Sequence, residues 1–66
     1  MRITVNGMER VVSAALTLQE LLEMDEEPIG HALVTVNRVQ VHLREYPSRV
    51  LEEGDEVDVI LPAFGG

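Results

Sequence analysis

The chain has only 66 residues and no cysteine, and this combination limits what it can fold into. A domain of this size buries only about 60% of the surface that its unfolded chain exposes, so it has room for one thin core. Without cysteine it also lacks disulfides and thiolate metal sites. Apolar residues make up 45% of the sequence, with one Phe, one Tyr and no Trp. We therefore expect a single folded domain with an aliphatic core and regular secondary structure.

The net charge of -7 comes from twelve acidic residues against five arginines. Negative charge opposes the phosphate backbone of nucleic acids, so we expect no nucleic-acid partner. It favours a partner with a basic surface, although solubility alone explains it equally well. No apolar run approaches the roughly 20 residues that span a bilayer, and residues 1–4 enter a strand-like pattern without a signal peptide. We expect a cytoplasmic protein without membrane contact, monomeric when free.

A β-hairpin is predicted at the start of the chain. Apolar and polar residues alternate over residues 2–6, and Asn6-Gly7 supplies the two positive-φ residues that a tight hairpin turn needs. The β-branched residues Val11 and Val12 follow, as in a second strand.

A short helix is predicted to start at Thr17. Thr17 and Glu20 have the spacing of a capping box. Leucines follow at helical spacing on one face, at Leu18, Leu21 and Leu22. Residues 23–30 are acidic and contain a proline and a glycine, so the helix should stop near Met24 and give way to a loop.

A second hairpin is predicted in the middle of the chain. Residues 32–36 are almost continuously apolar, and Val39 and Val41 alternate with polar residues. Between them Asn37-Arg38 could form the turn.

The end of the chain should add one more strand. Residues 43–53 have mixed character and predict an irregular segment with at most one helical turn, ending at the turn Gly54-Asp55. Three apolar residues then face one way in a last strand, namely Val57, Val59 and Leu61.

This order predicts an α+β fold, a mixed sheet of four to five strands wrapped around one helix. The first and last strands must both reach the centre of the sheet, because their apolar residues have to be buried together. The C-terminus should then emerge beside the first strand. We expect residues 1–61 to form the domain and residues 62–66 to form a flexible tail of roughly 16 Å.

The last two residues, Gly65 and Gly66, are the most informative feature for function. Without Cβ atoms they can pass through a narrow channel and let an enzyme's backbone approach the α-carboxylate. Frayed termini are common in small domains, and the dipeptide by itself favours that simpler interpretation.

Taken with the rest of the chain, this ending resembles the ThiS family. Five segments are similar to ThiS landmarks and occur in order: residues 1–7, 17–22, 34–37, 53–57 and 65–66. The resemblance implies the β-grasp fold of ubiquitin, which ThiS shares with its relative MoaD.

The resemblance also implies a role as a sulfur-carrying co-substrate, not an enzyme. A ubiquitin-activating-like, zinc-bearing adenylyltransferase (ThiF/MoeB-like) would use ATP to adenylate Gly66, next to Gly65, and a sulfur donor would displace AMP to leave a thiocarboxylate. Activation is needed because a free carboxylate is a poor electrophile. The chain itself would bind no cofactor.

The acceptor of the sulfur differs between relatives. In ThiS-like proteins it is thiazole synthase (ThiG-like), for thiamine, and in MoaD-like proteins it is the large subunit of molybdopterin synthase. The N-terminal half is similar to ThiS, whereas Pro62 is similar to a proline in MoaD-like tails. Thiamine is therefore our first expectation, with molybdopterin or another sulfur transfer as the alternative. A ubiquitin-like modifier and a non-covalent binding module are alternatives of other classes.

Four residues before the diglycine are candidates for partner binding. Phe64, with Pro62 beside it in the tail, could anchor the tail in a partner's groove, or it could fold back on the sheet. Ile60 should project from the outer sheet face, where ubiquitin-like proteins often present an apolar patch. Asp58 belongs to an acidic set that could steer the tail toward arginines or simply be a solvated edge: Glu52, Glu53, Asp55, Glu56 and Asp58.

We expect no metal site and no independent catalysis. His31 and His42 are eleven positions apart with no helical pairing. Carboxylates are plentiful, but so small a domain can build no apolar concave site around them to shift a pKa.

Overall fold

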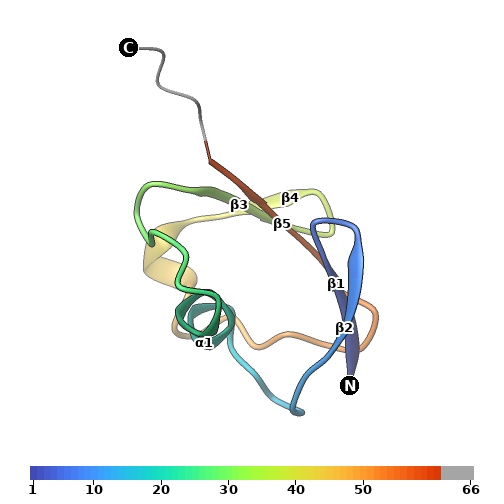
Figure 1. The fold of residues 1–66 in the computed structure, drawn as a ribbon. Coiled ribbons are helices and arrows are strands. Elements are labelled where there is room, and N and C mark those ends of the chain that lie inside the picture. Colours follow the sequence, from blue (N-terminus) through green and yellow to red (C-terminus); the bar gives the residue numbers. More distant parts are fainter. Residues whose placement is uncertain (62–66) are drawn as a thin grey trace.

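The computed structural model describes residues 1–61, which form a mixed sheet of five strands with one α-helix packed against it (Figure 1). The elements are β1 (Arg2–Val5), β2 (Met8–Val11), α1 (Leu18–Met24), β3 (Leu33–Val36), β4 (Val39–Val41), the 3₁₀ turn η1 (Leu43–Glu45) and β5 (Glu56–Ile60). The predicted α+β class and element order are confirmed. The predicted tail, residues 62–66, lies outside the described residues, and with it Pro62, Phe64, Gly65 and Gly66.

The strand order is β2-β1-β5-β3-β4, so the first and last strands lie at the centre of the sheet as expected. β1 and β5 run parallel, whereas the other neighbouring strands run antiparallel. Because β1 and β5 are parallel, β5 runs in the direction of the turn that follows β1 and continues past it (Figure 1).

Both predicted hairpins form through turns with two positive φ angles. These angles are 50° and 81° at Asn6 and Gly7, and 53° and 68° at Asn37 and Arg38. Two positive φ angles are what a type I′ turn requires, and such turns match the right-handed twist of the flanking strands. The second turn achieves this without glycine, although Arg38 carries a Cβ that disfavours the left-handed region.

The capping box predicted at Thr17 is present. The Thr17 hydroxyl accepts from the Glu20 N–H at 3.1 Å, and the Glu20 carboxylate accepts from the Thr17 N–H at 2.9 Å. These contacts satisfy two backbone donors at the start of α1, which runs to Met24 as expected. The leucine face of α1 is buried against the sheet.

The core is largely aliphatic, as the composition predicted, and it lies between one side of the sheet and the helix with its flanking loops. Its buried residues are Ile3, Val5, Val12, Leu16, Leu18, Leu21, Leu22, Val34, Val36, Val41, Tyr46, Leu51 and Val57. Alternate residues of β1, β3 and β5 point to the opposite, outer face of the sheet. In the part of the chain that the structure describes, no helix is long and apolar enough to cross a bilayer.

One expectation for the last strand is wrong. Leu61 was expected to share the buried face with Val57 and Val59, but β5 ends at Ile60 and Leu61 is 55% exposed. The reason is pairing: Ile60 lies opposite Leu33, the first residue of β3, so the β3 ladder ends there.

Candidate functional site

The candidate site is the end of β5, because this strand leads into the glycine-ended segment. β5 lies between β1 and β3, and its last residue, Ile60, pairs with Leu33. Of the predicted site residues, Ile60 and Asp58 lie in the described part of the chain. The remaining four, in the segment 62–66, stay predictions.

Two exposed apolar residues lie side by side where β5 ends, and we call them the exit patch: Leu33 and Ile60. Ile60 and Leu33 are register partners on the outer face and are 50% and 42% exposed. The predicted outward direction of Ile60 is therefore confirmed. Sequence reasoning missed Leu33, because the apolar run of residues 32–36 hides which of its members face outward. Two exposed apolar side chains directly opposite each other form a patch that a partner can cover.

Acidic residues border the exit patch on the same face. Asp58 precedes Ile60 by two positions in β5, lies opposite Thr35 of β3 and is partly buried. Glu56 lies one step further along the same face and is exposed. The outer face thus combines an apolar end with a negatively charged continuation.

One member of the predicted acidic set does not belong to this surface. Asp55 is only 7% exposed, and its two carboxylate oxygens accept from the Asn37 side-chain amide at 2.9 Å and from the Glu52 N–H at 2.8 Å. The Asn37 oxygen in turn accepts from the Glu56 N–H at 2.9 Å. Asp55 therefore holds the start of β5 in place. The expectation that it is a solvated or steering charge is wrong, because the carboxylate is enclosed by hydrogen-bond donors.

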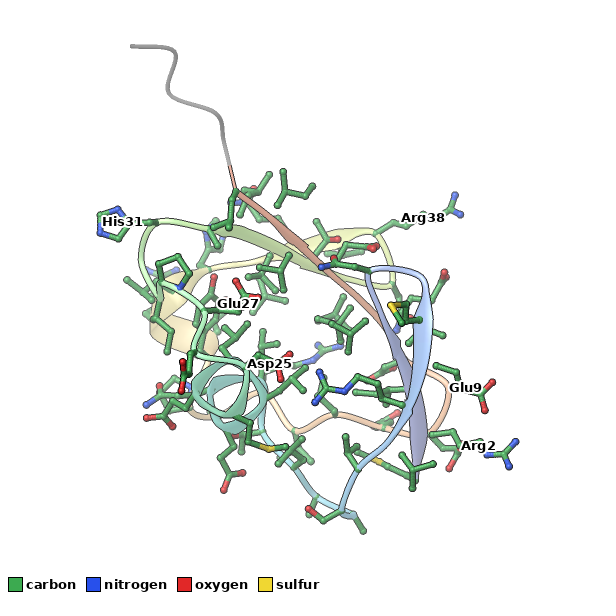
Figure 2. The ribbon with its side chains drawn as sticks, viewed as in Figure 1. Arg2, Glu9, Asp25, Glu27, His31 and Arg38 are labelled. Carbon is green, nitrogen blue, oxygen red and sulfur yellow. The ribbon has the colours of Figure 1, made fainter. Side chains whose placement is uncertain are left out.

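Three of the five arginines are paired or project from a turn at the start of β5. Arg10 forms an ion pair with Asp25 that ties β2 to the end of α1, and this hydrogen bond raises the pKa of Arg10. Arg2 lies 3.4 Å from Glu9 on the surface, and Arg38 points into solvent from the second turn (Figure 2). A basic partner could therefore approach the end of β5 without meeting these arginines.

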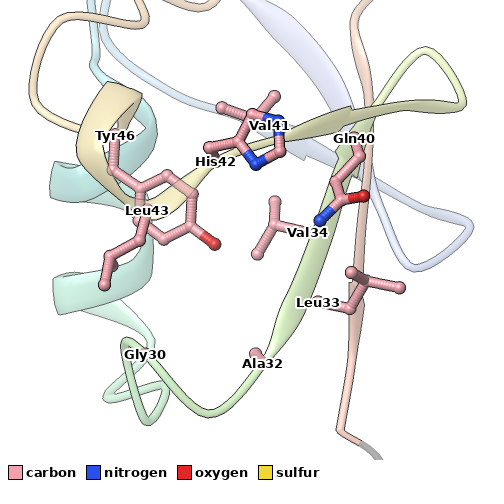
Figure 3. Close-up of a pocket in the computed structure, with 9 residues that line it drawn as sticks. All are labelled: Gly30, Ala32, Leu33, Val34, Gln40, Val41, His42, Leu43 and Tyr46. Carbon is pink, nitrogen blue, oxygen red and sulfur yellow. The ribbon is translucent and has the colours of Figure 1, made fainter.

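A pocket of about 180 Å³ opens where β4 diverges from β3 into η1 (Figure 3). It is lined by Gly30, Ala32, Leu33, Val34, Gln40, Val41, His42, Leu43 and Tyr46. The Tyr46 hydroxyl points into it, and burial raises the pKa of this phenol. No carboxylate is among these nine residues, and His42 is the other ionisable side chain beside Tyr46.

The two histidines are not joined in a ligand cluster. His42 lines this pocket, and His31 projects from the loop before β3 (Figure 2). Among residues 1–61, no group of three or more His, Cys, Asp or Glu side chains is placed to hold a metal ion.

Comparisons with known proteins agree with this architecture. The match to the ThiS family covers residues 1–66, and therefore the whole chain. The crystal structure of the thiamine biosynthesis protein ThiS from Geobacter metallireducens has a TM-score of 0.86 and 25% identity, with each chain covered completely. The solution structure of a thiamine biosynthesis protein from the same organism has a TM-score of 0.78 and 26% identity, covering all of this chain and 88% of that one. No curated protein matches the chain.

These likenesses confirm the ubiquitin-like β-grasp fold and the family resemblance inferred from the sequence. The chain belongs to the ThiS family.

Proposed function

We propose that this chain is the sulfur carrier of a thiamine biosynthesis pathway, and that its sulfur travels as a thiocarboxylate on Gly66. The observation that carries the proposal is the match to the ThiS family over all 66 residues, including the Gly65-Gly66 ending. Two solved structures that resemble this chain over its whole length are named for thiamine biosynthesis.

The chemistry follows from the groups that the sequence offers. A carboxylate resists nucleophilic attack, so it must first become a mixed anhydride. The Gly66 carboxylate attacks the α-phosphorus of ATP and pyrophosphate leaves. Sulfide then attacks the acyl carbon and AMP leaves with one of the former carboxylate oxygens, so that sulfur takes the place of that oxygen and a proton is released. The sequence has no cysteine, which makes the terminal carbonyl the position for the sulfur. ATP belongs to the activating enzyme, and the carrier is its substrate.

The outer face of the sheet is the proposed docking surface for two successive partners. These are a ubiquitin-activating-like adenylyltransferase of the ThiF type and then a thiazole synthase of the ThiG type. The exit patch would supply the apolar contact, and Asp58 and Glu56 beside it would favour basic partner surfaces. Pro62 and Phe64 would enter the partner's groove ahead of Gly65. We place these encounters in the cytoplasm.

The intact mass of the purified chain tests this proposal. The chain is incubated with the adenylyltransferase of its host, ATP and a sulfide source, and a chain lacking Gly65 and Gly66 serves as the control. We expect a mass gain equal to exchanging one oxygen for one sulfur, located at Gly66 by fragmentation. Absence of both this gain and an AMP adduct, with an enzyme shown to be active, would contradict the proposal in favour of a non-covalent binding module.

The presence of Pro62 supports a second acceptor, because it resembles the proline of MoaD-like tails. The purified thiocarboxylate should therefore be offered in parallel to a thiazole synthase and to the large subunit of molybdopterin synthase. Transfer to the first supports the thiamine route, and transfer to the second supports the molybdopterin route. An isopeptide bond to a protein lysine would instead indicate a ubiquitin-like modifier.

A further inference from the structure

The two neighbouring strands, β3 and β1, pair with β5 over different lengths. On the β3 side, register pairs continue to Ile60, the last residue of the strand. On the β1 side, the register pairs are Thr4 with Glu56 and Val5 with Val57. The second half of β5 therefore extends beyond the point where β1 turns away, just before the chain continues toward its C-terminus.

Asn6 continues the hydrogen bonding to β5 beyond the last residue of β1. Its N–H donates to the Val57 carbonyl oxygen at 2.9 Å. Its side-chain Oδ1 then accepts from the Val59 N–H at 2.8 Å, across 53 positions of sequence. The φ of 50° at Asn6 starts the hairpin turn, so one residue both reverses β1 and supplies the next rung of the ladder to β5. This hydrogen bond is exposed to solvent, so its role is to fix the geometry of the strand end and not to satisfy a buried donor.

The structure contains a close counterpart at the other end of the strand. Asn37 also has a positive φ, begins the second hairpin turn and accepts from a β5 N–H, that of Glu56. The two asparagines thus secure the end and the start of β5, respectively. They differ in the β5 residue that each holds, since Val59 is three positions closer to the C-terminus than Glu56.

We propose that Asn6 is a positioning residue for activation of the C-terminus, a role that rests on the proposed function. By holding Val59, it fixes the direction in which β5 leaves the sheet next to the exit patch. A partner that binds the exit patch and the terminal carboxylate at the same time needs a fixed distance and direction between the two. Loosening Val59 would make that relation variable, and binding would then have to order it.

The test compares substitutions that separate the side-chain acceptor from the backbone conformation. Asn6→Gly permits the positive φ and removes the side-chain acceptor, at the cost of added backbone freedom that the Asn37→Gly control shares. Asn6→Asp keeps a side-chain oxygen in a residue that tolerates positive φ. Asn37→Gly is the matched control, because it removes the equivalent acceptor at the start of β5. Each variant is measured for amide hydrogen exchange at Val59 and for kcat/KM of adenylation, at a temperature where unfolding measurements show it folded.

We expect Asn6→Gly to speed exchange at Val59 and to lower kcat/KM roughly fivefold, the effect of about one hydrogen bond. Asn6→Asp should restore most of both quantities. Asn37→Gly should leave kcat/KM near the wild-type value even where it costs more stability. A merely structural role for Asn6 would instead make the loss of kcat/KM follow stability in both glycine variants.

Two outcomes would overturn the inference. Unchanged exchange at Val59 in Asn6→Gly would show that the side chain does not hold the strand. An equal kcat/KM in Asn6→Gly and wild type would show that the contact does not matter for activation. If the wild type itself is not adenylated by an active enzyme, the proposed function fails first, and the role of Asn6 in activation fails with it.

Discussion

At the scale of single residues, polar side chains complete the backbone ladder of β5. Asn6 and Asn37 accept from N–H groups of this strand, and Asp55, the residue before it, accepts from the Asn37 amide. Asp55 is the most enclosed of them, and both of its oxygens accept hydrogen bonds. A buried acceptor of this kind holds several donors that would otherwise lose their contact with water without compensation.

Replacing Asp55 with alanine should therefore destabilise the domain. The substitution removes the acceptor of two partly buried hydrogen bonds, from the Asn37 amide and the Glu52 N–H. An unsatisfied donor costs about 1–3 kcal/mol where it is fully buried, and less where water can reach it. We expect a loss of roughly 2 kcal/mol in the free energy of unfolding, measured by urea denaturation.

Glu56→Ala is the matched control, because Glu56 is an exposed acidic neighbour. Its effect should stay within about 0.5 kcal/mol. If Asp55→Ala cost no more than this control, the carboxylate would not be holding the start of β5.

At the scale of the elements, the capping box decides where α1 begins. Glu20 is exposed, yet its carboxylate accepts from the Thr17 N–H and from the Thr17 hydroxyl. The backbone hydrogen bond from Thr17, followed by the side-chain one, lowers the pKa of Glu20 below its ordinary value of 4.5. The charged form of Glu20 is therefore favoured in the folded chain.

This linkage predicts a pH dependence. Because the folded pKa lies below the unfolded one, the stabilisation is fully present above pH 4.5 and is lost as the pH falls through the folded pKa. The stability advantage of wild type over Glu20→Gln, from denaturation at a series of pH values, should shrink as the pH falls below 4.5.

Glu23→Gln controls for the loss of one negative charge, since Glu23 is exposed on the same helix and lies outside the capping box. The difference in stability between wild type and Glu23→Gln should not shrink in the same way as the pH falls below 4.5. A pH-independent difference for Glu20→Gln would argue against the reciprocal cap.

At the scale of the whole molecule, the two faces of the sheet have different roles. The inner face packs against α1 and carries the stability of the domain. The outer face bears the exit patch and the acidic residues of β5, close to where the chain continues toward Gly66. This separation lets the docking surface be changed without disturbing the core.

Ile60→Asp should therefore weaken partner binding while preserving the fold. Placing a charge in the exit patch should raise the KM for adenylation roughly tenfold, as loss of a central apolar contact commonly does. The melting temperature should change little, because Ile60 is half exposed. Steady-state adenylation and thermal denaturation measure the two effects.

Val11→Asp provides the comparison. Val11 is 77% exposed and lies opposite Arg2 in the β1–β2 hairpin, away from the exit patch. It should leave the KM near that of wild type. Equal effects of the two substitutions would mean that total charge, and not the exit patch, governs binding.

Local sequence was sufficient for the elements and much of the topology. Asn6-Gly7 predicted the first turn because few other residues adopt two positive φ angles, and Thr17 with Glu20 predicted the start of the helix. Pairing of the first and last strands followed from the need to bury their apolar residues together. The outward direction of Ile60 followed from the two-residue period of a strand.

What local sequence could not predict depends on contacts between distant residues. The burial of Asp55 needs Asn37, which is 18 positions away, and the exposure of Leu61 depends on where β3 begins. Leu33 joins Ile60 only through the register of two strands. None of these contacts can be predicted from the residues that are adjacent in the sequence.

The sequence by itself therefore determined the family, the kinds and order of the elements, and the terminal glycines on which the proposed chemistry depends. Turns, caps and strand periods arise from interactions a few residues long, so a linear pattern carries them. Only the tertiary structure decided which side chains border the end of β5 and which asparagine holds it. Those contacts exist because the strand register brings residues 53 positions apart within hydrogen-bond distance.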